Sequence, residues 1–110
     1  YMLRKMTKLM DGLIVYPDNM MRNLEKTGGL IYSQSVLLAL VRKGITREEA
    51  YKLVQKNAMQ SWTTGKDFLK LLKKDKAIMK LLSATEIDKT FKLKTQFKNI
   101  DRIFKRVFTK

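Results

Sequence analysis

The side chains that most often carry out catalysis are missing from this sequence of 110 residues. It contains neither histidine nor cysteine, which excludes imidazole acid/base chemistry, thiolate nucleophiles and the commonest metal ligands. Glu48 and Glu49 are adjacent carboxylates, but neighbours on a helix point in different directions. A place in the first helical turn already explains both through capping and the helix dipole. We therefore expect no catalytic residue and no metal site within this chain.

A run of polar side chains between apolar segments is the strongest candidate for a site. Its members are Asn19, Arg22, Asn23, Thr27, Ser33, Gln34 and Ser35. Such residues can simply satisfy the unpaired backbone groups at helix ends. Alternatively, they form the wall of a polar cleft or a subunit contact, in which Arg22 binds an anion. Under this second interpretation, the residues that face a substrate cleft or an assembly contact are Arg22, Asn23, Ser33 and Gln34.

The chain is strongly basic, with a formal charge of +14. The segment from Lys66 onward holds 14 Lys and Arg against 5 Asp and Glu, so +9 of the total lies there. This balance favours nucleic acid, an anionic membrane or an acidic protein as partner, although lysine is also the ordinary exposed residue. Phosphate contacts need little more than dense lysines, but the sequence shows no device for reading bases.

The elements that position these residues are all predicted to be helices, because no segment alternates with period two for long enough to form a strand. Residues 1–15 carry an apolar stripe that includes Met2, Met6 and Met10, without a start signal. We interpret this as a chain that begins inside a helix. Pro17 ends that helix, and Asp18 or Asn19 could cap the next. Further helices are predicted over about 18–24, 31–43, 46–64, 68–72, 77–82, 84–91 and 95–108.

Local signals mark several of these boundaries. Capping boxes start helices at Thr46 and Ser83, Gly44 and Gly65 end helices, and the Gly28–Gly29 pair forms a turn. In the helix over 46–64, the residues expected to face inward are Ala50, Leu53, Val54, Ala58 and Trp62. In the last helix, one core stripe is expected to contain Phe97, Ile100, Ile103, Phe104, Val107 and Phe108. The sequence thus predicts one compact all-α unit of about six or seven helices.

Apolar runs are short throughout the chain. None approaches the roughly 20 residues that span a bilayer, and basic residues interrupt the first apolar segment, which does not fit a signal peptide. We expect a soluble, cytoplasmic protein without a membrane partner.

One long stretch resembles a known family. Residues 15–62 read VYPDNMMRNLEKTGGLIYSQSVLLALVRKGITREEAYKLVQKNAMQSW, similar to the C-terminal region of bacterial-type adenylosuccinate lyases. The shared motifs are Asn-Met after proline, Asn-Leu, Gly-Leu-Ile-x-Ser-Gln-x-Val-Leu-Leu-Ala-Leu, Arg-Glu-Glu-Ala-Tyr, Val-Gln-x-x-Ala-Met and the tryptophan. The ending FKNIDRIFKRVF looks like the final helix of that family. Two features depart from the family pattern: Asp18 stands where glutamate is common, and the charge is unusually high.

The resemblance implies an architecture. These lyases are part of the fumarase/aspartase superfamily of homotetramers, in which a central bundle of long helices is flanked by two smaller domains. By resemblance, residues 1–15 are the end of the last long bundle helix, and residues 16–110 are the C-terminal helical domain. The implied partners are the rest of the lyase chain, the other subunits of the homotetramer and a nucleotide substrate.

The resemblance also implies a reaction, which is elimination of fumarate from adenylosuccinate, giving AMP, and from the succinyl-carboxamide intermediate SAICAR. No metal or cofactor is implied. The family's serine base lies on a Gly-Ser-Ser loop and acts with histidines, and this sequence has neither that loop nor a histidine. We therefore expect this chain alone to be inactive and to cap the active site and support assembly. Two alternatives are a stand-alone basic module that binds nucleic acid non-specifically and an interaction domain that uses the methionine stripe.

Overall fold

The computed structural model describes residues 1–109, and within them the chain is helical with no strand. This confirms the all-α class. The elements are α1 (Met2–Asp11), α2 (Pro17–Glu25), the 3-10 helix η1 (Leu30–Tyr32), α3 (Ser33–Arg42), α4 (Arg47–Thr64), α5 (Phe68–Lys74), α6 (Lys76–Leu81), α7 (Ala84–Thr90), α8 (Leu93–Phe97) and α9 (Ile100–Phe108).

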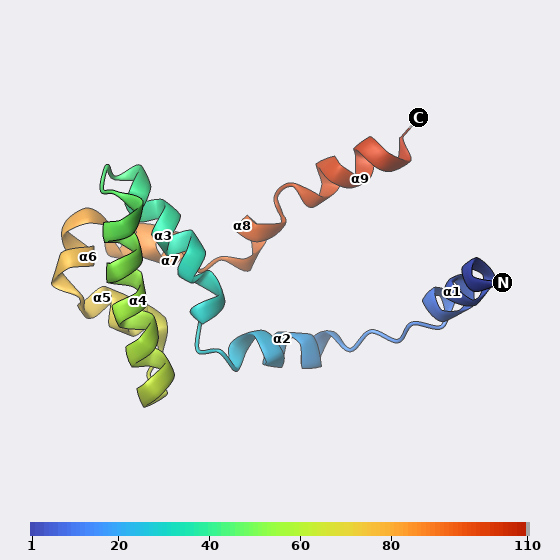
Figure 1. Cartoon of the computed structure of the whole chain (residues 1–110), viewed down its shortest axis with the longest axis horizontal. Coiled ribbons are helices and arrows are strands. Elements are labelled where there is room, and N and C mark those ends of the chain that lie inside the picture. The colour runs from blue at the N-terminus through green and yellow to red at the C-terminus, as the bar shows by residue number, and fades with distance from the viewer. Residues whose placement is uncertain (110) are drawn as a thin grey trace.

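The hydrophobic core lies among helices α3 to α7, which form the compact part of the molecule (Figure 1). α3 packs against α4 and α7, and α5 packs against α4, α6 and α7. The buried apolar cluster consists of Val36, Leu37, Leu40, Ala50, Val54, Phe68, Leu72, Ile78, Leu82 and Ile87. The short helices α5, α6 and α7 each contribute at least one of these residues, so tertiary packing rather than length stabilises them.

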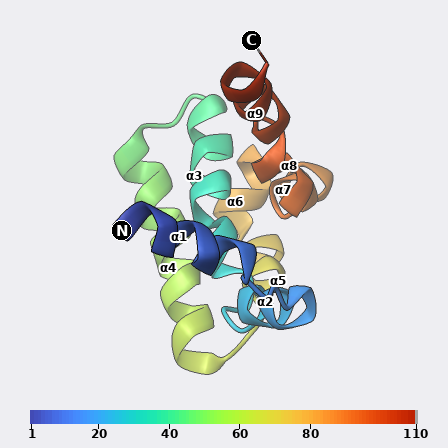
Figure 2. The same ribbon diagram turned by 90° about the vertical axis from the view of Figure 1, so that its right-hand side faces the viewer.

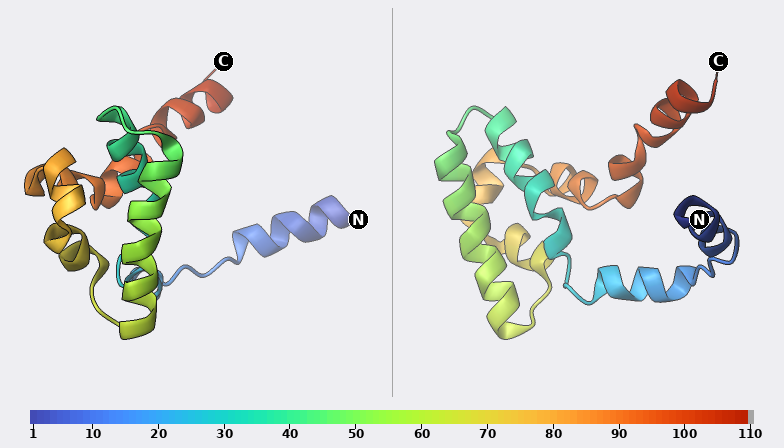
Figure 3. Two further views of the ribbon diagram at one scale, coloured as in Figure 1. Left: turned by 60° about the vertical axis from the view of Figure 1, so that its left-hand side comes forward. Right: turned by 45° about the vertical axis from the view of Figure 1, so that its right-hand side comes forward.

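Two arms extend from this core (Figures 1 and 3). α1 and α2 form the N-terminal arm, α8 and α9 form the C-terminal arm, and none of these four helices contains a buried residue. Both arms extend from the same side of the core in Figure 1, and in Figure 2, seen from that side, α9 appears above and α2 below. The radius of gyration is 18.5 Å, against about 13 Å for a compact domain of this length. The expected compactness therefore applies to the core and not to the arms.

The first two helix boundaries differ from the sequence prediction. α1 ends at Asp11, four residues before the predicted end, because Gly12 is a poor helix former and proline at 17 disfavours the helical conformation before it. Tyr16 accordingly has φ −113° and ψ 86°. Pro17 is itself the first residue of α2, so neither Asp18 nor Asn19 caps this helix. Proline is favoured at that position because its missing N–H has no helical partner to lose.

The predicted last helix is broken into α8 and α9, with Lys98 and Asn99 between them. Asn99 has φ −99° and ψ −7°, and asparagine is a poor residue for a helix interior. The predicted core stripe is wrong for this chain, because all six of its members are 42% to 76% exposed. The α3–α7 core closes without them, so this apolar face is uncovered.

The capping boxes at Thr46 and Ser83 are confirmed, and so is the C-terminal Gly65, with φ 67°. The predicted inner face of α4 is partly wrong. Trp62 is 72% exposed, while Asn57 and Ser61 are buried together with Ala50 and Val54. Those four positions have the four-, three- and four-residue spacing of one helix face. Small polar side chains can be buried there because the neighbouring segments supply their hydrogen-bond partners.

Candidate functional site

The four residues predicted for a cleft or assembly contact lie in two separate places. Arg22 and Asn23 are exposed on α2, and the Arg22 guanidinium donates a hydrogen bond to the side-chain oxygen of Asn19. Ser33 is half-buried and Gln34 is exposed in the first turn of α3. The turn over residues 26–32 separates the two pairs, and the three cavities described below are lined by other residues. The role of these four residues stays a prediction.

That intervening turn fixes the direction in which α2 leaves the core. Gly28 and Gly29 have φ values of 59° and 90°, a region that glycine adopts without steric cost. The Phe68 N–H donates to the Gly28 carbonyl at 3.1 Å. The Phe91 ring lies 5.0 Å from the Tyr32 ring and 6.0 Å from the Phe68 ring, between centroids. The turn is therefore held against an aromatic cluster of the core.

A small cavity of about 220 Å³ lies beside this turn. Its wall includes Lys26, Thr27, Ser61, the exposed Trp62 and Lys66. Two of its polar groups are already engaged, because the Thr27 hydroxyl donates to the Leu24 carbonyl at 3.0 Å and the Ser61 hydroxyl donates to the Lys66 carbonyl at 2.6 Å. The volume is below the roughly 300 Å³ at which small-molecule sites begin. Its small volume and its paired hydroxyl groups indicate a gap left by the turn, and not a ligand site.

A larger cavity of about 480 Å³ opens between α3, α7 and α8. Its wall carries four cationic side chains, one carboxylate, several hydroxyl and amide groups and an apolar floor. The lining residues are Ser35, Leu38, Ala39, Arg42, Lys43, Leu82, Glu86, Lys89, Thr90, Thr95, Gln96 and Lys98. The side-chain amide of Gln96 donates to the Ser35 hydroxyl oxygen at 2.7 Å and so joins α8 to α3. Sequence analysis missed this site because it combines residues 61 positions apart.

Among the residues that the structure describes, Glu86 is the one carboxylate that lines this cavity. Lys43 Nζ lies 2.7 Å from its Oε1, and the Ser83 N–H donates to its Oε2 at 2.9 Å. The hydrogen bond from Lys43, followed by those from Ser83, lowers the pKa of Glu86 from its ordinary value of 4.5 to about 2. This carboxylate is therefore ionised and already paired at neutral pH.

The depressed pKa of Glu86 predicts a pH dependence of folding. A carboxyl group whose pKa is lower in the folded state stabilises the fold above its unfolded pKa, and this contribution is lost as pH falls through the folded pKa. We expect the urea midpoint of unfolding to fall between about pH 5 and pH 2, and the Glu86→Gln variant to show a smaller fall. Circular dichroism over that range measures both. If the urea midpoint of the variant fell as steeply with pH as that of the unmodified chain, the lowered pKa of Glu86 would be contradicted.

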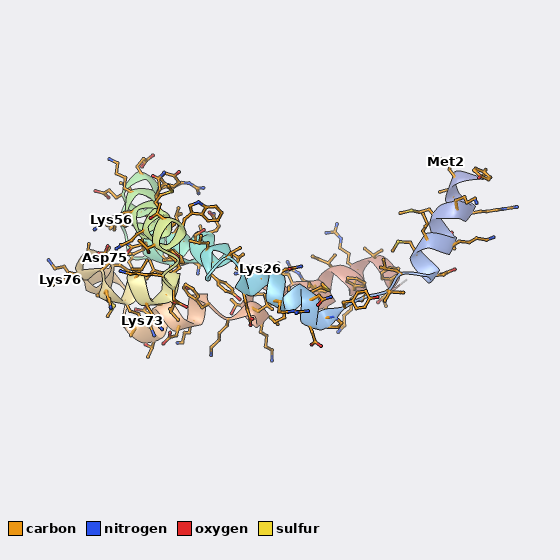
Figure 4. The ribbon with its side chains drawn as sticks, turned by 90° about the horizontal axis from the view of Figure 1, so that it is seen from below. Met2, Lys26, Lys56, Lys73, Asp75 and Lys76 are labelled. Carbon is orange, nitrogen blue, oxygen red and sulfur yellow. The ribbon has the colours of Figure 1, made fainter. Side chains whose placement is uncertain are left out.

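Asp75 is a second charged centre, at the junction of α5 and α6 (Figure 4). Its side chain is 8% exposed and lies 3.5 Å from Lys56 Nζ. It accepts from the Asn57 amide at 2.9 Å and from the Ala77 N–H at 2.9 Å. Burial alone would raise its pKa, but these hydrogen bonds, that of Ile78 and the charge of Lys56 outweigh it, so the pKa is lowered. Each of these contacts joins parts of the core, which indicates a structural role.

The third cavity, of about 670 Å³, lies between α4 and α6. Its floor is apolar, with Ile45, Leu53, Ala77 and Leu81, and its rim carries Glu49, Lys52, Lys76 and Lys80. Nothing in the described residues covers it. None of the helices within residues 1–109 is long and apolar enough to cross a bilayer.

Comparison with known proteins shows what this chain is similar to. Residues 29–107 match the family model for the adenylosuccinate lyase C-terminus. Over 108 residues, the chain is 46% identical to a protein of Synechocystis sp. named adenylosuccinate lyase. That alignment covers 97% of this chain and 25% of the relative, so the chain spans about a quarter of the length of the curated relative that it matches.

Proposed function

This chain belongs to the adenylosuccinate lyase family and corresponds to its C-terminal part, and on that premise we propose that it serves as one domain of a fumarate-eliminating lyase. The proposed reaction converts adenylosuccinate into AMP and fumarate and acts in the same way on SAICAR, in purine nucleotide biosynthesis. The observation that carries this proposal is 46% identity over 97% of the chain.

The chemistry of the proposed reaction would reside outside residues 1–110. Elimination of fumarate needs a base that removes a proton and groups that stabilise the developing negative charge. The sequence has no histidine, and the strongly shifted carboxylate, Glu86, is ionised and paired with Lys43 at neutral pH. We therefore assign this chain a supporting role, which is to cap the active site and hold the assembly together.

The uncovered apolar faces support this role. In α1, Met2, Leu3 and Leu9 are 69% to 84% exposed, and α9 carries a comparable face. Large contiguous apolar surfaces usually mark interaction sites. We assign residues 1–15 to the end of a long bundle helix and residues 16–110 to the C-terminal helical domain. The partners that cover these faces would be the rest of the lyase chain and the other subunits of a cytoplasmic homotetramer.

Arg22 and Asn23 on α2, and Ser33 and Gln34 on α3, are the proposed cleft or assembly residues. They lie on either side of the turn at which α2 leaves the core, so a partner packed along α2 could reach both pairs. Arg22 can bind a phosphate or carboxylate group in a bidentate manner. The alternative of non-specific nucleic-acid binding depends on the net charge alone, and neither match points to it.

A fumarate-release assay tests the proposed function. We expect the native polypeptide that contains these residues to release fumarate from adenylosuccinate, and residues 1–110 alone to release none. In the native polypeptide, Arg22→Gln should raise KM or weaken assembly several-fold, because its fork of donors is lost. The matched control is Lys26→Gln, which removes the same charge at the C-cap of α2, four residues beyond Arg22.

Two results would contradict the proposal. One is a native polypeptide that releases no fumarate, and the other is full activity of residues 1–110 alone. Equal effects of Arg22→Gln and Lys26→Gln would overturn only the role of Arg22, since both variants change the net charge by the same amount.

A further inference from the structure

We propose that the 480 Å³ cavity between α3, α7 and α8 is a binding site for a small organic phosphate, separate from the proposed lyase reaction. Its size lies within the roughly 300–1,000 Å³ of ordinary small-molecule sites. Its wall combines cations with an apolar floor, which is the composition that a phosphate group attached to an apolar body requires.

The charge of the wall is the first argument. Arg42, Lys43, Lys89 and Lys98 face one carboxylate, Glu86, which makes the net charge +3. Lys43 already pairs with Glu86, so the positive charge left over comes from the other three. Arg42 and Lys89 lie in the last turns of α3 and α7. Each helix C-terminus offsets roughly half a unit of this positive charge, which leaves about +2. That balances the charge of a phosphate monoester, about −1.5 to −2 at pH 7.

The hydrogen-bonding groups are the second argument. The Ser35 hydroxyl oxygen accepts from the Gln96 amide at 2.7 Å, so the hydroxyl hydrogen is free to donate toward a phosphate oxygen. Arg42 can supply a bidentate pair of donors to the same group. Thr90 is not available for this purpose, because its hydroxyl donates to the Ile87 carbonyl at 2.7 Å. Both of these donors come from α3, and the Lys89 ammonium of α7 lines the same cavity.

The apolar floor is the third argument, and it favours an organic phosphate over an inorganic ion. Leu38, Ala39 and Leu82 line the cavity, and Leu38 is 39% exposed. An apolar ring that covers Leu38 would remove this surface from water, which favours binding.

Titration calorimetry with phenyl phosphate tests this proposal on the native polypeptide that contains residues 1–110. Phenyl phosphate should bind saturably, and inorganic phosphate and phenol, its two halves, should each bind at least tenfold more weakly. The double variant Arg42→Gln/Lys89→Gln should lower the affinity for phenyl phosphate by tenfold or more. The matched control is Lys52→Gln/Lys80→Gln, which makes the same charge change on the rim of the third cavity and should alter affinity by less than twofold.

Each other outcome overturns a defined part of the proposal. No saturable binding, or equal losses in the two double variants, would mean that the cavity is no site and that only net charge attracts anions. Equal affinities for inorganic phosphate and phenyl phosphate would remove the role of the apolar floor. The result does not depend on the proposed lyase activity, because calorimetry reports binding and the fumarate assay reports catalysis.

Discussion

Replacing Gly29 with alanine is expected to lower the free energy of unfolding by about 2–5 kcal/mol, one of the two largest effects that the structure predicts. Gly29 has φ 90°, where a residue with a Cβ is strained by roughly 1–2 kcal/mol. A Cβ at this position would also lie 2.9 Å from Phe91 Cε1. The Phe91 ring is held by the Tyr32 and Phe68 rings, so it cannot move aside without disturbing them. Overpacking of this kind costs about 1–3 kcal/mol more.

Gly44→Ala is the matched control for this prediction. Gly44 has a similar φ of 97°, but no heavy atom lies within 4 Å of the position that its Cβ would take. The control should therefore show the backbone strain alone, roughly 1–2 kcal/mol. Urea denaturation of both variants measures the difference. Equal losses would show that the Phe91 ring turns away and that the close approach has no energetic consequence.

The Gly29 variant also bears on the proposed function. The turn that contains Gly29 connects α2, with Arg22 and Asn23, to the core. If the turn sets the direction of α2, Gly29→Ala should reduce assembly or lyase activity of the native polypeptide more than Gly44→Ala does, at a temperature where both variants are folded.

Asp75→Ala is expected to lower the free energy of unfolding by about 2–4 kcal/mol. Asp75 caps α6 through the Ala77 and Ile78 N–H groups, and loss of a cap costs about 1 kcal/mol. It is also the partner of the Asn57 amide. Asn57 is 3% exposed, and leaving a buried polar group short of a partner costs about 1–3 kcal/mol. The ion pair with Lys56 adds little, because an exposed lysine contributes less than about 1 kcal/mol.

Asp67→Ala separates these two contributions. Asp67 caps α5 through one hydrogen bond from the Lys70 N–H, at 3.0 Å in an exposed position, so its removal should cost only about 1 kcal/mol. A double-mutant cycle with Asn57→Ala and Asp75→Ala should give a coupling energy of about 1 kcal/mol or more. The structural role of the Asn57–Asp75 contact would be refuted if Asp75→Ala cost no more than Asp67→Ala and the coupling energy were zero.

Features that depend on a few consecutive residues could be predicted from the sequence. The capping boxes at Thr46 and Ser83 form as expected, because each is made by groups only three residues apart. Gly65 ends α4 in the left-handed region for an equally local reason. The long ordered motifs over residues 15–62 were enough to identify the family, since the matching residues can be read without a structure.

The cavity between α3, α7 and α8 could not be predicted from the sequence. Nor could the sequence show which residues of α4 are buried. Periodicity favoured Trp62 as a core residue, yet its indole is exposed while Asn57 and Ser61 face inward. Their burial depends on Asp75 and on the Lys66 carbonyl, groups that the chain brings back only after it turns. The organic-phosphate site likewise requires α8 to fold against α3, where Gln96 meets Ser35.

By itself, then, the sequence determined the all-helical class, most element boundaries and the family, because these depend on backbone preferences and on groups within one helical turn. Only the tertiary structure decided which faces are covered. It left the apolar stripes of α1 and α9 exposed, and it joined four cations at or near the C-terminal ends of α3, α7 and α8 around one cavity. Burial depends on which surfaces meet in space, and amphipathic periodicity indicates that a face needs a partner without indicating where that partner lies.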